Sequence, residues 1–234
     1  MKPYKAIFLD WDDTIGDWEN AARRALEDIY STYHLDQLYA SFEDYLNVYH
    51  PYNLKLWGLY GNHEISKEYL QFERFYRPLM VSAEPTINGR LKEEVAREIG
   101  GVFLHLTNKY FSLLPDADRV VRYLAEKYPL TIISNGFREV QYYKFEHSGL
   151  QSCFAHTLIS DEIGSGKPLP EIFRIALERN GVKADESIMI GDSYSSDIMG
   201  AKNAGIDQIW LHQGETAETA TYIIPRLADV LNIL

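Results

Sequence analysis

The chain has little of what marks a secreted or membrane-bound protein. Its 234 residues include one cysteine, Cys153, so no intrachain disulfide can form, and beside Phe154 this thiol is read as a packing side chain. No run approaches the ~18 apolar residues that span a bilayer, and no basic segment followed by an apolar signal core opens the sequence. We therefore expect a soluble, cytoplasmic protein with no membrane partner.

Positive charge is also scarce. The sequence holds 23 Lys and Arg against 34 Asp and Glu, for a formal net charge of −11. Nucleic-acid binders display basic surfaces, so no nucleic-acid partner is expected, and an anionic substrate must be held by a few local groups. A hydrophobic content of 46% is enough for a substantial core, and the length fits one domain that carries a sizeable insertion.

Three carboxylates follow the first apolar run of the chain. Residues 5–9 read as a short buried strand of a parallel sheet, and Asp10, Asp12 and Asp13 come directly after it. Ligands bind at the carboxyl ends of such strands, and crowded carboxylates need a cation or proton to relieve their repulsion. The residues indicate a Mg²⁺ site. The alternative is that these aspartates only form a turn and cap the next helix.

Residues 18–113 have a different character, with aromatic and aliphatic side chains at helical spacings and no convincing alternating strand. This pattern predicts a mainly helical insertion, whose aromatic stripes are more often helix packing than ligand contacts. The predicted helices are residues 18–33, 42–49, 66–80 and 88–111, the last interrupted near Gly100 and Gly101.

After Pro115, helical and apolar segments alternate regularly, which predicts a parallel sheet with right-handed crossovers. Polar residues stand where each strand stops, at Ser134-Asn135 and at Gly191-Asp192-Ser193. The fold class is therefore α/β, a doubly wound parallel sheet with an inserted helical domain. The expected helices are residues 116–127, 140–148, 170–180 and 196–204, and the expected strands are residues 130–133, 157–159, 187–190 and 208–211.

Four motifs in this order resemble those of the haloacid dehalogenase superfamily of phosphohydrolases. They are Asp10-Trp11-Asp12-Asp13-Thr14, Ser134-Asn135, Lys167-Pro168 with Pro170, and the run 191–201. A single D-x-D-x-T is weak evidence, but four motifs at strand ends are specific. The resemblance implies an α/β catalytic core at residues 1–17 and 101–234, and an inserted helical cap at residues 18–100.

The resemblance also implies roles for the residues of the first motif. Asp10 would be the nucleophile that forms an aspartyl-phosphate. Asp12 would protonate the leaving alkoxide and later deprotonate the hydrolytic water, and Thr14 would orient the loop. Because the second acid is present, phosphate chemistry is favoured over carbon–halogen cleavage.

Metal and phosphate ligands follow from the same resemblance. Mg²⁺ would be held by the Asp10 and Asp192 side chains and the Asp12 backbone carbonyl, with Asp197 supporting through water or by fixing Lys167. The phosphoryl oxygens would be held by Ser134, the amide of Asn135 and the Lys167 ammonium.

The substrate is less sharply indicated. Asp13 departs from the glycine common at its position, and the segments 135–141, 144–150 and Leu56-Trp57 resemble the bacterial pyrimidine nucleotide 5′-nucleotidase branch. A small-molecule phosphomonoester, here a pyrimidine nucleoside monophosphate, is the expected substrate. Its base would contact residues drawn from Trp57, Tyr60, Arg74 and Phe137.

Two other functions stay open. A sugar-phosphate phosphatase or a phosphomutase could use the same core, because the motifs specify phosphoryl transfer and not the leaving group. A phosphate-responsive binding protein without turnover is disfavoured, since no catalytic position is substituted. The sequence leaves monomer and homodimer unresolved.

Overall fold

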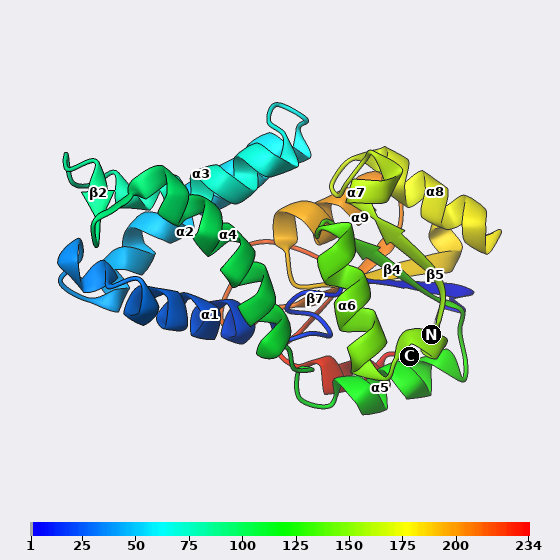
Figure 1. Cartoon of the computed structure of the whole chain (residues 1–234). Helices are drawn as coiled ribbons and strands as arrows, with labels where there is room; N and C mark the ends of the chain where they lie inside the picture. The colour runs from blue at the N-terminus through cyan, green and yellow to red at the C-terminus, as the bar shows by residue number, and fades with distance from the viewer. Residues whose placement is uncertain (1) are drawn as a thin grey trace. The chain divides into compact units, whose positions relative to one another are not determined.

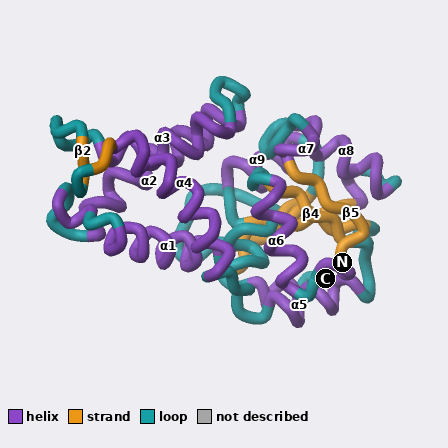
Figure 2. The backbone as a smooth tube through the Cα atoms, viewed as in Figure 1, coloured by secondary structure: helices purple, strands orange, loops and turns teal. Residues whose placement is uncertain are grey.

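A computed structural model describes residues 2–234 (Figure 1). The chain divides into two compact units, one made of the residues up to Glu19 together with Phe111–Leu234, and the other of Asn20–Tyr110. The first unit combines strands and helices, whereas the second is mainly helical (Figure 2). The predicted α/β class with a helical insertion is confirmed.

A six-stranded parallel sheet organises the first unit, in the order β5-β4-β1-β6-β7-β8. The predicted strands are all present, and within this sheet the sequence pattern missed the short β8 at the edge. The strands are β1 (Ala6–Leu9), β4 (Leu130–Ser134), β5 (Phe154–Ile159), β6 (Ser187–Gly191), β7 (Asp207–Leu211) and β8 (Tyr222–Ile224).

Strand β1 lies at the point where the strand order reverses. Ile7 pairs with Leu130 of β4 on one side and with Ile188 of β6 on the other. The chain runs from β1 outward through β4 to β5, then returns to β6 on the opposite side of β1. In open α/β sheets, ligands bind outside the carboxyl ends of strands at such a reversal. The loops after β1, β4 and β6 are therefore placed to form a site.

Helices cover both faces of the sheet, which explains why β1 is apolar throughout. Ile7 and Leu9 pack in one core cluster with Val120 of α5 (Ala117–Ala125) and Phe145 of α6 (Arg138–Ser148). The alternate side chains, Ala6 and Phe8, pack in a second cluster with residues of α8 (Pro170–Asn180) and α9 (Met199–Asn203). All four β1 side chains are fully buried, so the strand is held rigidly from both sides.

The second unit packs helices against one another. Its elements are α1 (Trp18–Thr32), α2 (Phe42–Gly61), α3 (Lys67–Leu79) and α4 (Lys92–Lys109), with a short antiparallel hairpin of β2 (Thr86–Ile87) and β3 (Arg90–Leu91). Ser66 caps α3, its Oγ accepting a hydrogen bond from the Tyr69 backbone N–H at 3.2 Å.

Three predictions about these helices are wrong, concerning α2, the β2–β3 hairpin and the glycine pair of α4. Helix α2 does not end at Tyr49 but continues through Pro51, because Tyr45, Tyr49 and Leu56 form one buried face across the proline. The hairpin was also missed, although Asn88-Gly89, both with positive φ, is a strong two-residue turn signal.

Helix α4 is not interrupted at Gly100 and Gly101. A Cβ on Gly100 would lie 3.2 Å from the carbonyl oxygen of Gln71 on α3, so this glycine permits a close helix–helix approach and does not break the helix. The compact units accordingly separate after Tyr110, ten residues later than the predicted boundary. Within residues 2–234, no helix combines the length and apolarity that crossing a bilayer requires.

Candidate active site

Asp10 directly follows β1 and is 8% exposed. Its Oδ1 lies 2.5 Å from the Lys167 ammonium nitrogen. Burial raises the pKa of Asp10 well above its usual range; Lys167 opposes this shift, and the charges of Asp197 and Asp192 add to it. The carboxylate thus depends on nearby positive charge to stay ionised.

Lys167 is the positive charge closest to this carboxylate. Its side chain is 2% exposed, and its ammonium lies 2.7 Å from Asp197 Oδ1 as well as against Asp10. Burial disfavours the charged ammonium, but the two carboxylates outweigh that effect and raise the pKa of Lys167. A lysine held this way stays protonated and can face a phosphoryl group.

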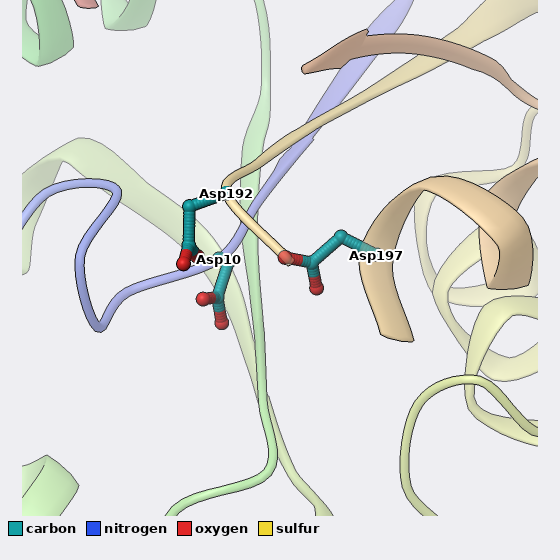
Figure 3. Close-up of side chains that lie close together, drawn as sticks. All are labelled: Asp10, Asp192 and Asp197. Atoms are coloured by element: carbon teal, nitrogen blue, oxygen red, sulfur yellow. The ribbon is translucent and has the colours of Figure 1, made fainter. Parts of the chain in front are cut away.

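Asp10, Asp192 and Asp197 form a carboxylate cluster in which one oxygen from each lies within 4.8 Å of the others. Figure 3 shows the three side chains reaching toward one region from separate segments of the chain. Burial, followed by the charge of Asp197, raises the pKa of Asp192 to about 6. Hard oxygen donors that repel one another, one of them on the partly exposed Asp192, fit a small divalent cation such as Mg²⁺. The Asp12 side chain is not part of this cluster.

A tight turn after β6 orients Asp197. Tyr194–Ile198 form one turn of π-helix, where an α-helix was predicted to begin at residue 196, and Asp197 Oδ2 accepts a hydrogen bond from the Ser193 backbone N–H at 3.0 Å. Such single π-turns are frequent at functional sites. A Cβ on Gly191 would lie 2.5 Å from Asp197 Cγ, so only glycine leaves room for this carboxylate.

The loop after Asp10 is tied to the same region. Thr14 is fully buried, and its Oγ1 donates a 3.3 Å hydrogen bond to Asp192 Oδ1. Asp13 has φ 57°, the left-handed conformation that explains why glycine is common there, and its Oδ1 accepts from the Glu19 N–H at 2.8 Å. The turn-and-cap alternative therefore describes Asp13, while Asp10 and Asp192 face the cluster.

The second motif lies at the end of β4. Ser134 is 1% exposed and its Oγ accepts from the Gly136 N–H at 3.1 Å. The Asn135 side chain bonds the Lys167 backbone twice, Nδ2 donating to the Lys167 carbonyl at 2.7 Å and Oδ1 accepting from its N–H at 2.8 Å. The amide that we expect at the phosphate is therefore the Asn135 backbone N–H, while its side chain fixes the backbone of Lys167.

The Asp12 side chain has partners to which sequence reasoning gave no role. Its Oδ1 lies 2.5 Å from the Lys144 ammonium, and its Oδ2 accepts from Gln141 Nε2 at 2.8 Å. Both partners come from α6. The sequence did contain a sign that these two residues are functional. Gln141 and Lys144 occupy core-facing helical positions beside Val140 and Phe145, where apolar residues are normal.

The four predicted specificity residues are divided between the two units. In the helical unit, Trp57 and Tyr60 of α2 are half-buried with ring centroids 5.8 Å apart. Arg74 of α3 is 2% exposed, with its guanidinium 5.0 and 4.8 Å from the ring centroids of Phe75 and Phe103. In the core unit, Phe137 is 3% exposed and precedes α6.

Comparison with known proteins identifies the fold and the family. The family model described as haloacid dehalogenase-like hydrolase matches residues 4–205. The crystal structure of the putative HAD-hydrolase YfnB from Bacillus subtilis, bound to magnesium, is 25% identical, superimposes with a TM-score of 0.80, and the match covers 99% of both chains.

Curated relatives of similar identity carry different names. Glyceraldehyde 3-phosphate phosphatase of Pyrococcus furiosus is 31% identical over 100% of this chain and 94% of its own length. Pyrimidine 5′-nucleotidase YjjG of Escherichia coli is 31% identical over 97% of this chain and 96% of its own length. Together with the family match over most of the sequence, these similarities show that the chain belongs to the haloacid dehalogenase-like hydrolases.

Proposed function

We propose that the protein is a Mg²⁺-dependent phosphomonoester hydrolase that acts through an aspartyl-phosphate, with pyrimidine nucleoside monophosphates as its substrates. The observation that carries the proposal is the pairing of Asp10 with the buried Lys167 ammonium, 2.5 Å apart, inside a cluster of three carboxylates. A phosphate dianion can approach a carboxylate nucleophile only where positive charge cancels their repulsion.

The two carboxylates of the first motif, Asp10 and Asp12, carry out the bond changes and the proton transfers of the proposed reaction. Asp10 attacks phosphorus while the bond from phosphorus to the ester oxygen breaks, and Asp12, which is protonated at this step, transfers its proton to the departing alkoxide and becomes a carboxylate. Asp12 then takes a proton from a water molecule whose oxygen attacks phosphorus. The bond between phosphorus and Asp10 breaks, and inorganic phosphate leaves.

Other residues of the site bind and orient the groups that react. The Ser134 hydroxyl, the Asn135 backbone N–H and the Lys167 ammonium bind the phosphoryl oxygens, and Asp197 fixes Lys167 through the 2.7 Å ion pair. Mg²⁺ would be held by the Asp10 and Asp192 carboxylates and the Asp12 backbone carbonyl, with support from Asp197. Mg²⁺ bound there supplies positive charge that offsets the charge of the phosphoryl group.

The nucleotide assignment rests on the aromatic helical unit and on one class of relative. Two pyrimidine 5′-nucleotidases, YjjG and PynA of Streptococcus pneumoniae, are 31% and 29% identical to the chain. A nucleobase needs flat aromatic surface and a few polar donors. The half-buried rings of Trp57 and Tyr60 offer such a surface in the helical unit, whereas Arg74 and Phe137 are buried within their own units.

A sugar-phosphate or triose-phosphate phosphatase is the second candidate. It is favoured by the glyceraldehyde 3-phosphate phosphatase of P. furiosus, which is as similar to the chain as YjjG is. A phosphomutase on the same core remains a third. The shared catalytic residues cannot separate these substrates, because they contact the phosphoryl group and not the leaving group.

The test is phosphate release from a panel of pyrimidine and purine monophosphates, sugar phosphates and glyceraldehyde 3-phosphate, with Mg²⁺ and with EDTA. We expect Mg²⁺-dependent release and the highest kcat/KM with a pyrimidine monophosphate. A preference for a sugar or triose phosphate would select the second candidate. Absence of release from every compound, including an aryl phosphate, would reject the hydrolase and favour a binding protein.

A further inference from the structure

The side chain of Asp12 is held by two buried polar residues of one helix. Lys144 is 2% exposed, and its ammonium lies 2.5 Å from Asp12 Oδ1. Gln141 is 1% exposed, and its Nε2 donates to Asp12 Oδ2 at 2.8 Å. Each oxygen of the carboxylate therefore has one fixed donor, and two points of attachment set both the position and the rotation of the group.

The ammonium group of Lys144 is held beside Asp12 by a second contact, with an aromatic ring. Its ammonium also lies 4.1 Å from the centroid of the Trp18 ring, at the start of α1. A buried lysine costs several kcal/mol unless it is paired, and the pair with Asp12 together with the indole face satisfies the charge away from water. The ammonium is thereby kept beside Asp12.

Gln141 is not explained by stability. Its Oε1 is buried and has no hydrogen-bond partner among the described residues. An unsatisfied buried carbonyl costs about 1–3 kcal/mol, and a leucine of similar volume would avoid that cost. Packing of the core therefore does not explain a glutamine at position 141. The hydrogen bond that Gln141 donates to Asp12 does explain it.

Gly136 provides the space for Gln141. A Cβ on Gly136 would lie 2.7 Å from Gln141 Cδ and 3.0 Å from its Cγ. The second motif thus has a glycine two residues after Ser134 that lets the amide reach Asp12. Three elements therefore contact one another in sequence. Gly136 in the loop after β4 makes room for Gln141 of α6, and Gln141 contacts Asp12 in the loop after β1.

We propose that Lys144 and Gln141 are positioning residues that hold Asp12 in the orientation from which it transfers protons to the leaving group and from water. This inference rests on the proposed function. A carboxylate has about four acceptor positions, so two fixed donors leave lone pairs free for the transferred proton. Because the donors approach from α6, the free positions have a defined direction, and loss of either donor lets the carboxylate rotate.

The test compares two esters of similar size whose leaving groups differ in their need for a proton. Benzyl phosphate releases an alkoxide that must be protonated, whereas 4-nitrophenyl phosphate releases a stable phenolate. For Lys144→Met we expect kcat/KM to fall about 100-fold for benzyl phosphate and less than about threefold for 4-nitrophenyl phosphate, within the range usual for general acid catalysis. Lys202→Met, an exposed lysine of α9, is the matched control and should change neither.

A second readout follows the water-attack step. If Asp12 is misplaced as the base, hydrolysis of the aspartyl-phosphate slows and the variant releases a stoichiometric burst of 4-nitrophenolate before a slow steady state. Loss of packing alone would lower the active fraction and shrink both phases together. Two results would overturn the proposal. An equal loss of kcat/KM for the two esters without a burst would mean that Lys144 supports the core. A uniform rise in KM would mean that Lys144 contacts the substrate.

Two further variants keep the test decisive if Lys144→Met fails to fold. Gln141→Leu removes an unpaired carbonyl and should keep the melting temperature, yet lower kcat/KM for benzyl phosphate about tenfold more than for the aryl ester. Gly136→Ala should give the same selective loss by displacing Gln141. A wild-type protein that hydrolyses neither ester would instead contradict the proposed function itself.

Discussion

Single side chains decide whether the site can react. Replacing Asp10 with asparagine removes the proposed nucleophile and keeps its volume, so Asp10→Asn should lower phosphate release by more than about 1,000-fold, toward background, and leave circular dichroism unchanged. One fewer crowded carboxylate should also leave the melting temperature of the metal-free protein equal or higher. Asp36→Asn, at an exposed residue of the helical unit, is the control. Near-wild-type release by Asp10→Asn would exclude the covalent route.

Asp192 is one of the proposed metal ligands. Its carboxylate lies in the cluster with Asp10 and accepts a hydrogen bond from Thr14. Asp192→Ala should raise the Mg²⁺ concentration for half-maximal activity by about tenfold or more, because one anionic ligand is lost. Titration of activity with Mg²⁺ measures this shift. An unchanged requirement would remove Asp192 from the proposed ligand set.

The same residue gives the metal-free protein a pH dependence. Its pKa rises from an ordinary value of 3.8 to about 6 in the folded state, so the folded protein binds the proton more tightly than the unfolded chain. The associated stability is present below pH 3.8 and is lost as the pH rises through 6. In EDTA, the melting temperature of the wild-type protein should therefore fall between pH 4 and pH 7 by more than that of Asp192→Asn. Parallel curves for the two proteins would contradict the shift.

At the scale of elements, the turn after β6 is the feature that positions Asp197. Because a Cβ at position 191 would overlap the Asp197 carboxyl group, Gly191→Ala should displace it and loosen its ion pair with Lys167. We expect kcat to fall about 10- to 100-fold and the melting temperature to drop by several degrees.

A matched glycine provides the control for this substitution. Gly101 lies inside α4, and a Cβ there would meet nothing within 4 Å. Gly101→Ala should stabilise the protein by about 0.5–1 kcal/mol through helix propensity without changing kcat. If the two variants behave alike in activity and in thermal melts, the proposed role of Gly191 is wrong.

Helices and strands whose ends are set by neighbouring residues could be predicted from the sequence. Helix α8 begins at Pro170 and ends before Gly181 as expected, since a first-turn proline and a following glycine act within a few residues. The π-turn at Tyr194–Ile198 and the continuation of α2 through Pro51 could not be predicted, because both depend on packing partners distant in sequence. In the site, the motifs predicted the grouping of Asp10, Lys167 and Asp192. The sequence also marked Gln141 and Lys144 as polar residues on a core-facing helix side, but their contact with Asp12 depends on how α6 packs and could not be predicted.

For the whole molecule, the open question is which ester the enzyme selects. If Trp57 stacks on a base, Trp57→Ala should lower kcat/KM for pyrimidine monophosphates about 10- to 100-fold more than for an aryl phosphate, since stacking contributes about 1–3 kcal/mol. The melting temperature should stay nearly constant. If Trp57 instead supports the helical unit, the substitution should lower the melting temperature and affect both substrates alike.

The position of β1 has a consequence for how the protein is made. Ile7 pairs with Ile188, so the strand that bears Asp10 leaves the ribosome roughly 10–40 s before its β6 partner, at 5–20 residues per second. The segment Asn20–Tyr110 is continuous and can collapse during that interval, and β4 can pair with one edge of β1, while the β1 edge that pairs with β6 stays open. Nascent chains stalled before β6 should therefore expose this strand to chaperones, and the catalytic unit should become protease-resistant only once β6 has been synthesised.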